Sequence, residues 1–419
     1  MTTRSILLIS FDFPPSQSSS GMLRIVSFAR ALLAAGWSVT VLTADRRDAT
    51  ASKAENEHLI PPECQVIRAR AYDAAQKFSI AGKYPGILEL PDRFSSWIPF
   101  AVVAGMRHLR RAPVSTILSS YPIASAHVVG CALARFSGAK WIADFRDPMV
   151  LDGHPNTPAR RRAHRRGERT TMKHCKMALF TNQTVRDVFH ARYPQSAGTG
   201  FEVIENGYDD VVFARAETLY RQQRSAAPRR EVTLLHSGSL YPDHRDPRAL
   251  FSALSAMQRR GLFAAKPLRV VLRASGYEAR FRQLIARDYP ELAEIVQFGA
   301  PVDYVSSVAE ALASDGLLLL QGASCNAQVP AKLYEYARTG RPILALTDAG
   351  GATAATLRKL GVREFADLRD PQAIENLLCA FMERLPAGNW QGWVPDVDTA
   401  ALARSHRGAE LVSLLEGIE

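Results

Sequence analysis

The chain has 419 residues, which is more than one small module needs and suits two large domains. Its composition, 47% hydrophobic and 22% charged, is that of an ordinary globular protein and excludes extensive disorder. The formal net charge is +11, and residues 1 to 213 hold most of the excess, with 27 Lys and Arg against 18 Asp and Glu. Such a field favours phosphate-rich partners.

The cysteines and the apolar runs indicate in which compartment the protein is expected. Five cysteines lie far apart without a C-x-x-C pair, which predicts neither a disulfide framework nor a zinc ribbon. The two apolar stretches at 5–9 and 97–106 are shorter than the roughly twenty residues that a membrane span needs. We therefore expect a cytoplasmic protein.

The first 44 residues read as one strand-helix-strand unit. An apolar run at 6–10 is followed by a Pro- and Ser-rich loop that ends at Gly21. Apolar residues then recur at helical spacing up to Leu33, Gly36 ends the helix, and 38–44 is a β-branched strand. This order predicts a parallel α/β sheet with its loops at the carboxyl ends of the strands.

The same alternation continues along the chain. Helices are expected at 124–136 and 184–192, and an Arg-rich polar stretch at 214–230 is the best linker candidate. The remaining strands are expected at 115–119, 140–143, 178–181, 201–205, 232–236, 268–273, 295–298, 316–321 and 342–346. Two similar α/β halves are the simplest interpretation, namely 1–213 and 231–395 joined by that linker.

Two segments of the first half carry candidate ligand-binding groups. The amides near Gly21, at a strand-to-helix loop, suit a phosphate or a sugar oxygen, although the glycine could equally be an ordinary loop residue. Asp144-Phe-Arg146-Asp147-Pro148 ends a strand with two carboxylates and a guanidinium, at the edge where open α/β sheets bind ligands. The alternative is an internal Arg–Asp pair with a structural role.

A basic segment spans 158–176 and holds eight Arg and Lys against Glu168 alone. Most such runs are solvated helix faces. Together with the apolar stretch at 97–106, however, the segment could rest on an anionic lipid surface.

The most informative line of the second half runs from Gln321 to Pro342. A buried strand leads into a loop of small residues and then into a helix that starts near Pro330-Ala331 and carries Lys332 and Glu335 on one face. The loop amides and Lys332 suit a pyrophosphate, and a carboxylate one turn later suits a ribose hydroxyl pair. A surface ion pair at this spacing is the alternative.

These residues resemble the nucleotide-sugar glycosyltransferases of the GT-B fold, specifically glycosyltransferase family 4, over nearly the whole chain. The matching segments are Phe13-Pro14-Pro15 with Gly21, Asp144 to Pro148, Val203 to Asp209, and Pro330 to Tyr336 with Gly340-Arg-Pro342. The resemblance implies two Rossmann-like domains facing across a cleft, with the C-terminal segment 396–419 forming a helix that returns to the N-terminal domain.

The resemblance also assigns roles to individual residues. Arg245, Lys332, Arg146 and Asp147 are the expected catalytic residues. The nucleotide is expected at Gly238, Ser239, Pro330, Ala331, Lys332 and Glu335, and the donor sugar and acceptor at Gly21, Asp144, Arg146, Asp147 and Asn206. Two positions depart from the family pattern: Ala327 replaces a common Glu, and Ser239 a common cation.

The implied reaction moves a sugar from a nucleotide diphosphate sugar to a glycan or lipid-linked acceptor with retention, in surface polysaccharide or glycoconjugate synthesis. Neither a cofactor nor a metal is expected, because cations and helix N-termini can stabilise the departing diphosphate. Asp396-Val-Asp398 is more simply explained as a helix cap than as a metal site. A peripheral location on the inner face of the membrane would suit a lipid-linked acceptor.

Three alternatives remain at this stage. An epimerase or hydrolase of the same fold would need an acid and a base, for which Asp144 and Asp147 are the obvious candidates. A catalytically inactive partner subunit would explain Ala327 and Ser239. A nucleic-acid binder would use the basic helix, but the chain lacks the interleaved aromatic residues of such proteins, and no nucleic acid is expected.

Overall fold

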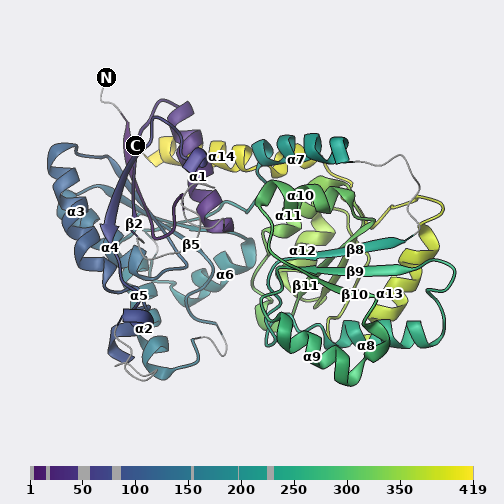
Figure 1. Cartoon of the computed structure of the whole chain (residues 1–419). Coiled ribbons are helices and arrows are strands. Elements are labelled where there is room, and N and C mark those ends of the chain that lie inside the picture. The colour runs from purple at the N-terminus through teal and green to yellow at the C-terminus, as the bar shows by residue number, and fades with distance from the viewer. Residues whose placement is uncertain are drawn as a thin grey trace. The chain divides into compact units, whose positions relative to one another are not determined.

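The computed structural model describes residues 4–15, 19–45, 57–77, 86–151, 155–196, 198–223 and 231–418. The chain forms two compact units: unit 1 contains residues 1–206 and 404–419, and unit 2 contains residues 207–403. Each unit has one parallel sheet with helices on both faces (Figure 1). The predicted α/β class is confirmed.

Unit 1 is built on a seven-stranded sheet in the order β3-β2-β1-β4-β5-β6-β7. Its central strand β1 has no exposed apolar side chain from Ile6 to Ile9, because helices cover both faces of a parallel sheet. The strands are β1 (Ser5–Ser10), β2 (Ser38–Asp45), β3 (Gln65–Arg70), β4 (Thr116–Ser120), β5 (Lys140–Arg146), β6 (Met177–Phe180) and β7 (Gly200–Val203).

The helices of unit 1 include the last helix of the chain, α14, which packs against α1 (Figure 1). A side chain at Gly408 would overlap Ala31, so the glycine permits this close packing. The expected return of the C-terminal helix to unit 1 is thus confirmed for Arg404–Ile418, whereas residues 396–403, expected in the same helix, belong to unit 2. The helices are α1 (Ser20–Ala34), α2 (Ala74–Lys77), α3 (Trp97–Arg111), α4 (Ser125–Ser137), α5 (Pro158–His174), α6 (Gln183–Arg192) and α14 (Arg404–Ile418), with short 3-10 turns η1 (Glu57–Leu59) and η2 (Gly86–Glu89).

Unit 2 has a six-stranded sheet in the order β10-β9-β8-β11-β12-β13, with one apolar core on each face. Its strands are β8 (Val232–Ser237), β9 (Leu268–Arg273), β10 (Val296–Gly299), β11 (Gly316–Gln321), β12 (Ile343–Thr347) and β13 (Phe365–Ala366). Its helices are α7 (Asp210–Gln223), α8 (Arg248–Arg259), α9 (Glu278–Asp288), α10 (Tyr304–Ala313), α11 (Lys332–Thr339), α12 (Ala352–Lys359) and α13 (Pro371–Arg384), with η3 (Pro290–Leu292), η4 (Ala323–Cys325) and η5 (Thr399–Leu402).

The segment expected to be a linker at 214–230 is helical as far as Gln223. The helix α7 starts after Asp209, whose side chain accepts a hydrogen bond from the amide of Val212 at 3.0 Å. Its apolar side, with Val212 and Phe213 buried, packs against α10, so α7 belongs to unit 2. The polar face of this helix made it look like a linker; residues 224–230 lie outside the described residues.

The apolar stretch at 97–106 forms the first two-thirds of α3. Trp97 is fully buried and its ring meets Phe11 edge to face at 5.3 Å, and Ala101 and Gly105 are buried on the same side, so one side of this stretch belongs to the core of unit 1. Only Phe100 and Val103 are exposed large apolar side chains on α3, at 41% and 46%. Within the described ranges, none of the helices is both long and apolar enough to span a membrane.

Candidate functional site

The carboxyl edge of the sheet in unit 2 carries a tight turn after β8. Gly238 has a φ of +118°, which favours glycine, and a Cβ there would overlap the Nζ of Lys332. That Nζ donates to the carbonyl oxygen of Ser237. The turn and the start of α11 are therefore in direct contact, and residues 94 positions apart in the sequence form one group.

A second cation, Arg245, closes the other side of this turn. Its Nε donates to Oε1 of Gln321 at 3.1 Å, and its Nη1 donates to the carbonyl oxygen of Ser239 at 3.3 Å. Burial is the main cause that lowers the pKa of Lys332 to about 7; the charge of Arg245 acts in the same direction, and Glu335 opposes the shift. An anion placed between these two cations would favour the charged amine.

Glu335 lies one helical turn after Lys332 on α11. Its side chain is half-buried, and Oε1 accepts a hydrogen bond from the hydroxyl of Tyr304 at 2.6 Å. Tyr304 is the first residue of α10, so the carboxylate is held between two helices. A fixed carboxylate beside a phosphate-sized positive site suits the two hydroxyls of a ribose.

The strand-end loops of unit 2 are joined through their backbones. The amide of Leu240 donates to Ser275 at 2.9 Å, and the amide of Ala274 donates to Gly299 at 2.8 Å. Ala274 has a φ of +55°, which is unusual for a residue with a side chain. The bonds fix the backbones of these loops relative to the Gly238 turn.

His236 is the last buried side chain of β8 and lies below the turn. Burial holds its pKa well below the ordinary value, and the cations of Lys332 and Arg245 add to the effect. The ring is therefore neutral, and its Nδ1 donates to the carbonyl oxygen of Leu318 at 2.9 Å. The ring thus links β8 to β11 beneath the Gly238 turn without adding charge.

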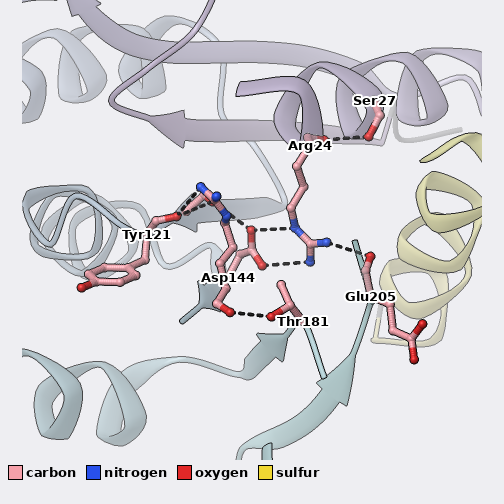
Figure 2. Close-up of polar contacts among 8 residues, drawn as sticks. Arg24, Ser27, Tyr121, Asp144, Thr181 and Glu205 are labelled. Carbon is pink, nitrogen blue, oxygen red and sulfur yellow. Dashed lines mark hydrogen bonds and ion pairs between the residues drawn. The ribbon is translucent and has the colours of Figure 1, made fainter. Parts of the chain in front are cut away.

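Unit 1 has a buried ion pair at the equivalent edge. Nε and Nη2 of Arg24 donate to the two oxygens of Asp144 at 3.1 and 3.0 Å, and Nη1 donates to the carbonyl oxygen of Glu205 at 3.1 Å (Figure 2). The hydroxyl of Ser120 also donates to Asp144, at 2.8 Å. Asp144 is fully buried. Asp144 thus has a structural role, as the alternative interpretation held, but its partner is Arg24 of α1 and not Arg146 of the same motif.

Arg146 follows on the same strand in a left-handed conformation, with a φ of +49°. Its Nη1 donates to the carbonyl oxygen of Tyr121 at 3.1 Å, and its Nη2 donates to the hydroxyl of Ser20 at 3.3 Å. The guanidinium lies directly over Gly21, where a Cβ would overlap it. Gly21 therefore admits the Arg146 side chain to the first turn of α1, a role that the sequence did not indicate.

The other site predictions of unit 1 lie close by. Asp147 is half-buried, and its charge raises the pKa of Arg146, which burial lowers. Asn206 is half-buried and follows Glu205, whose carbonyl oxygen Arg24 holds. The sequence analysis missed Arg24, although a single Arg among the buried residues of α1 is a usable signal; it also missed Tyr304 and Gln321, which no local pattern marks.

Within the described residues, no group of three or more His, Cys, Asp or Glu side chains is placed to hold a metal. Asp398 of the D-x-D string accepts a hydrogen bond from the amide of Ala400 at 2.9 Å and caps η5. This carboxylate therefore has the capping role that the sequence favoured.

No protein-family model matches the chain, and no curated protein matches it. Solved structures with the same architecture include sucrose-phosphate synthase from Thermosynechococcus elongatus, with a TM-score of 0.68 and 16% identity over 99% of both chains. HepE from Anabaena in complex with UDP has a TM-score of 0.65 and 15% identity, over 99% of this chain and 100% of its own. A UDP-N-acetylglucosamine 2-epimerase has a TM-score of 0.57 and 12% identity, over 100% and 98%. These likenesses confirm the GT-B fold.

We predict that Asp144→Asn lowers the free energy of unfolding of the chain by about 3 to 5 kcal/mol, because Arg24 would stay buried without a counter-charge. Urea denaturation measures this. Asp187→Asn is the matched control, because Asp187 pairs with Arg186 at the surface, where a pair contributes about 1 kcal/mol or less. Equal losses in the two variants would contradict a structural role for the buried pair.

Lys332 predicts a pH-dependent stability difference. Its pKa is about 7 in the folded chain and 10.5 in a model peptide, so between these values the unfolded chain binds more protons. Stability owed to this group therefore rises with pH across that window. We expect Lys332→Met to unfold at higher urea concentration than the wild type at pH 6, with a margin that shrinks by pH 9. Exposed Lys359→Met should show no such trend; a constant margin for Lys332→Met would contradict the shifted pKa.

Proposed function

We propose that the chain is a retaining glycosyltransferase that uses a nucleotide diphosphate sugar as donor. The observation that carries the proposal is the arrangement in unit 2: Lys332 and Arg245 on the Gly238 turn, with Glu335 one helical turn further. Two cations spaced around a turn suit a diphosphate, and the carboxylate beyond them suits the ribose. Each of these residues was a candidate from the sequence.

These residues would stabilise the negative charge that develops during the reaction. As the bond between the sugar and the diphosphate breaks, its electron pair moves to the phosphate oxygen, and the charge there grows. Lys332, Arg245 and the amides at the start of α11 would stabilise that charge, and one such donor typically contributes about 3 to 4 kcal/mol. The departing phosphate would take the proton of the acceptor hydroxyl, whose oxygen bonds to the sugar on the same face. The scheme requires neither a metal nor a cofactor.

The solved structures of similar fold support a uridine nucleotide as the first donor to test. HepE binds UDP and has been solved with UDP-glucose. Because these proteins share only about 15% identity with this chain, they guide the choice of ligands, while the site residues carry the argument.

An epimerase of the same fold is the alternative that the comparisons raise. An epimerase needs an acid and a base near the sugar. Both oxygens of Asp144 are occupied by Arg24, and Ser120 adds a third bond, so this carboxylate is not available as a base. Only Asp147 of the two sequence candidates remains. The transferase is the better interpretation for that reason.

We also propose that the acceptor is glycan- or lipid-linked and is reached at an anionic membrane surface, as in surface polysaccharide synthesis on the cytoplasmic side. The supporting feature is the α3–α5 surface, formed by exposed Phe100 and Val103 of α3 and exposed Arg162, Arg165 and Arg166 of α5. Both helices pack against α4. Exposed apolar and basic side chains together suit reversible binding to anionic lipid.

The nucleotide site predicts that one of UDP, GDP, ADP, CDP and dTDP binds, and that Glu335→Ala weakens that binding by roughly 10- to 150-fold. The reason is the loss of charge-assisted hydrogen bonds to the ribose, worth about 1.5 to 3 kcal/mol. Isothermal calorimetry at fixed salt measures both. Glu278→Ala, which removes an exposed carboxylate on α9, is the matched control. Failure of all five nucleotides to bind would overturn the proposed function, and equal affinity of Glu335→Ala would remove Glu335 from the site.

The α3–α5 surface predicts that the chain sediments with anionic vesicles at 0.1 M salt and not with neutral ones. Replacing Arg162, Arg165 and Arg166 by Gln should abolish this, because each Arg contributes about 1 kcal/mol at such a surface. At 1 M salt, where the Debye length falls to about 3 Å, the wild type should be released. The control replaces Arg259, Arg287 and Arg369 of unit 2, which removes the same charge elsewhere. Wild-type chain that ignores anionic vesicles would contradict membrane contact.

A further inference from the structure

The carboxyl edge of unit 1 has more buried positive than negative charge. The guanidinium of Arg146 is close enough to those of Arg24 and Arg404 for both to lower its pKa, while Asp144 and Asp147 raise it. Three cations therefore face two carboxylates. One of the two, Asp144, is fully used by Arg24, because both of its oxygens are bonded to that side chain.

Arg146 forms an ion pair with neither carboxylate, although both lie near enough to raise its pKa. Its hydrogen bonds go to two neutral acceptors, the carbonyl oxygen of Tyr121 and the hydroxyl of Ser20. Among the residues that the structure describes, none offers it a carboxylate within ion-pair distance. The residue is also partly exposed, unlike Arg24, which is 3% exposed. Arg146 can therefore reach a ligand, whereas Arg24 cannot.

The surroundings hold this guanidinium in place before a ligand arrives. The register of β5 against β6 shifts between Asp144 and Arg146, and the hydroxyl of Thr181 bonds the carbonyl oxygen of Arg146. The missing side chain of Gly21 lets the guanidinium lie on the first turn of α1. The positive end of that helix adds to the field at the same place. The Arg146 side chain is therefore already ordered, so an anion binds it at little cost in conformational entropy.

We infer that Arg146 binds an anionic group, a phosphate by its chemistry, on the acceptor of the reaction. The inference deepens the proposed function, because it takes unit 1 as the acceptor side. A phosphate offers several charged oxygens to a guanidinium fork and to helix amides, and this pairing is among the strongest in proteins. The phosphate can belong to a soluble sugar phosphate or to a polyprenyl phosphate carrier.

The test is calorimetry in the presence of the nucleoside diphosphate that binds, at a concentration that fills unit 2. Two matched pairs are titrated: glucose 6-phosphate against glucose, and farnesyl phosphate against farnesol below its aggregation limit. We expect the phosphorylated member of at least one pair to bind at least ten times more tightly than its neutral partner. The pair that discriminates tells a soluble from a lipid-linked source.

Variants of Arg146 test whether this side chain is responsible for the tighter binding of the phosphorylated ligand. Arg146→Gln should weaken the phosphorylated ligand by roughly 10- to 150-fold, the range of a charge-assisted bond, and Arg146→Lys should have a smaller effect because it keeps the charge and loses the fork. Arg186→Gln, which removes a partly exposed Arg of α6 that pairs with Asp187, should change nothing. Nucleotide affinity should stay the same in all three, which also reports that the chain is folded.

Two results would overturn the inference. One is wild-type chain that binds neither phosphorylated ligand more tightly than its neutral partner, which needs no variant to be interpreted. The other is undiminished binding of the phosphorylated ligand by Arg146→Gln. Should no nucleoside diphosphate bind, the proposed function fails, and the same titrations without nucleotide still decide whether Arg146 holds a phosphate.

Discussion

Both units place buried positive charge at the carboxyl edge of a parallel sheet, and the need to compensate that charge governs the rest of the structure. A buried cation is costly unless an anion or a set of hydrogen-bond acceptors faces it. In unit 1 the protein supplies one full partner, the carboxylate of Asp144 for Arg24. In unit 2 Lys332 bonds a backbone carbonyl, and burial together with the charge of Arg245 lowers its pKa in spite of Glu335. The positive charge at the edge of unit 2 is thus compensated best by a bound anionic ligand.

This contrast separates residues that look alike in the sequence. Asp144 and Glu335 are both carboxylates near a cation at a sheet edge. Asp144 is closed off by Arg24 and Ser120, so its contribution is to stability. Glu335 accepts a hydrogen bond from the hydroxyl of Tyr304 and is only half-buried, so it can still meet a ligand. In the proposed transferase reaction the protein stabilises charge and the substrates exchange the proton. The cations and the two carboxylates described above fit this reaction better than acid-base catalysis by the protein.

Much of the fold could be predicted because helices and strands of a parallel α/β sheet have distinct apolar periods. The strands at 268–273 and 316–321 were predicted at the residues that form them. The strand β3 was missed, because its alternating apolar and charged residues at the sheet edge give a weak signal. For the site, local motifs located Lys332, Glu335 and Arg146. The contacts of Gln321 with Arg245 and of Tyr304 with Glu335 could not be predicted, because the fold brings these residues together from segments far apart in the sequence. Arg24, the partner of Asp144, left one signal, an Arg among the apolar residues of α1.

A crystal structure of the chain with its preferred nucleoside diphosphate bound tests the central claim most directly. The diphosphate should lie on the Gly238 turn within hydrogen-bond distance of Lys332 and Arg245, and the ribose hydroxyls should meet Glu335. A nucleotide bound elsewhere on the chain, or a diphosphate that contacts neither cation, would contradict the claim that these buried charges are compensated by the donor.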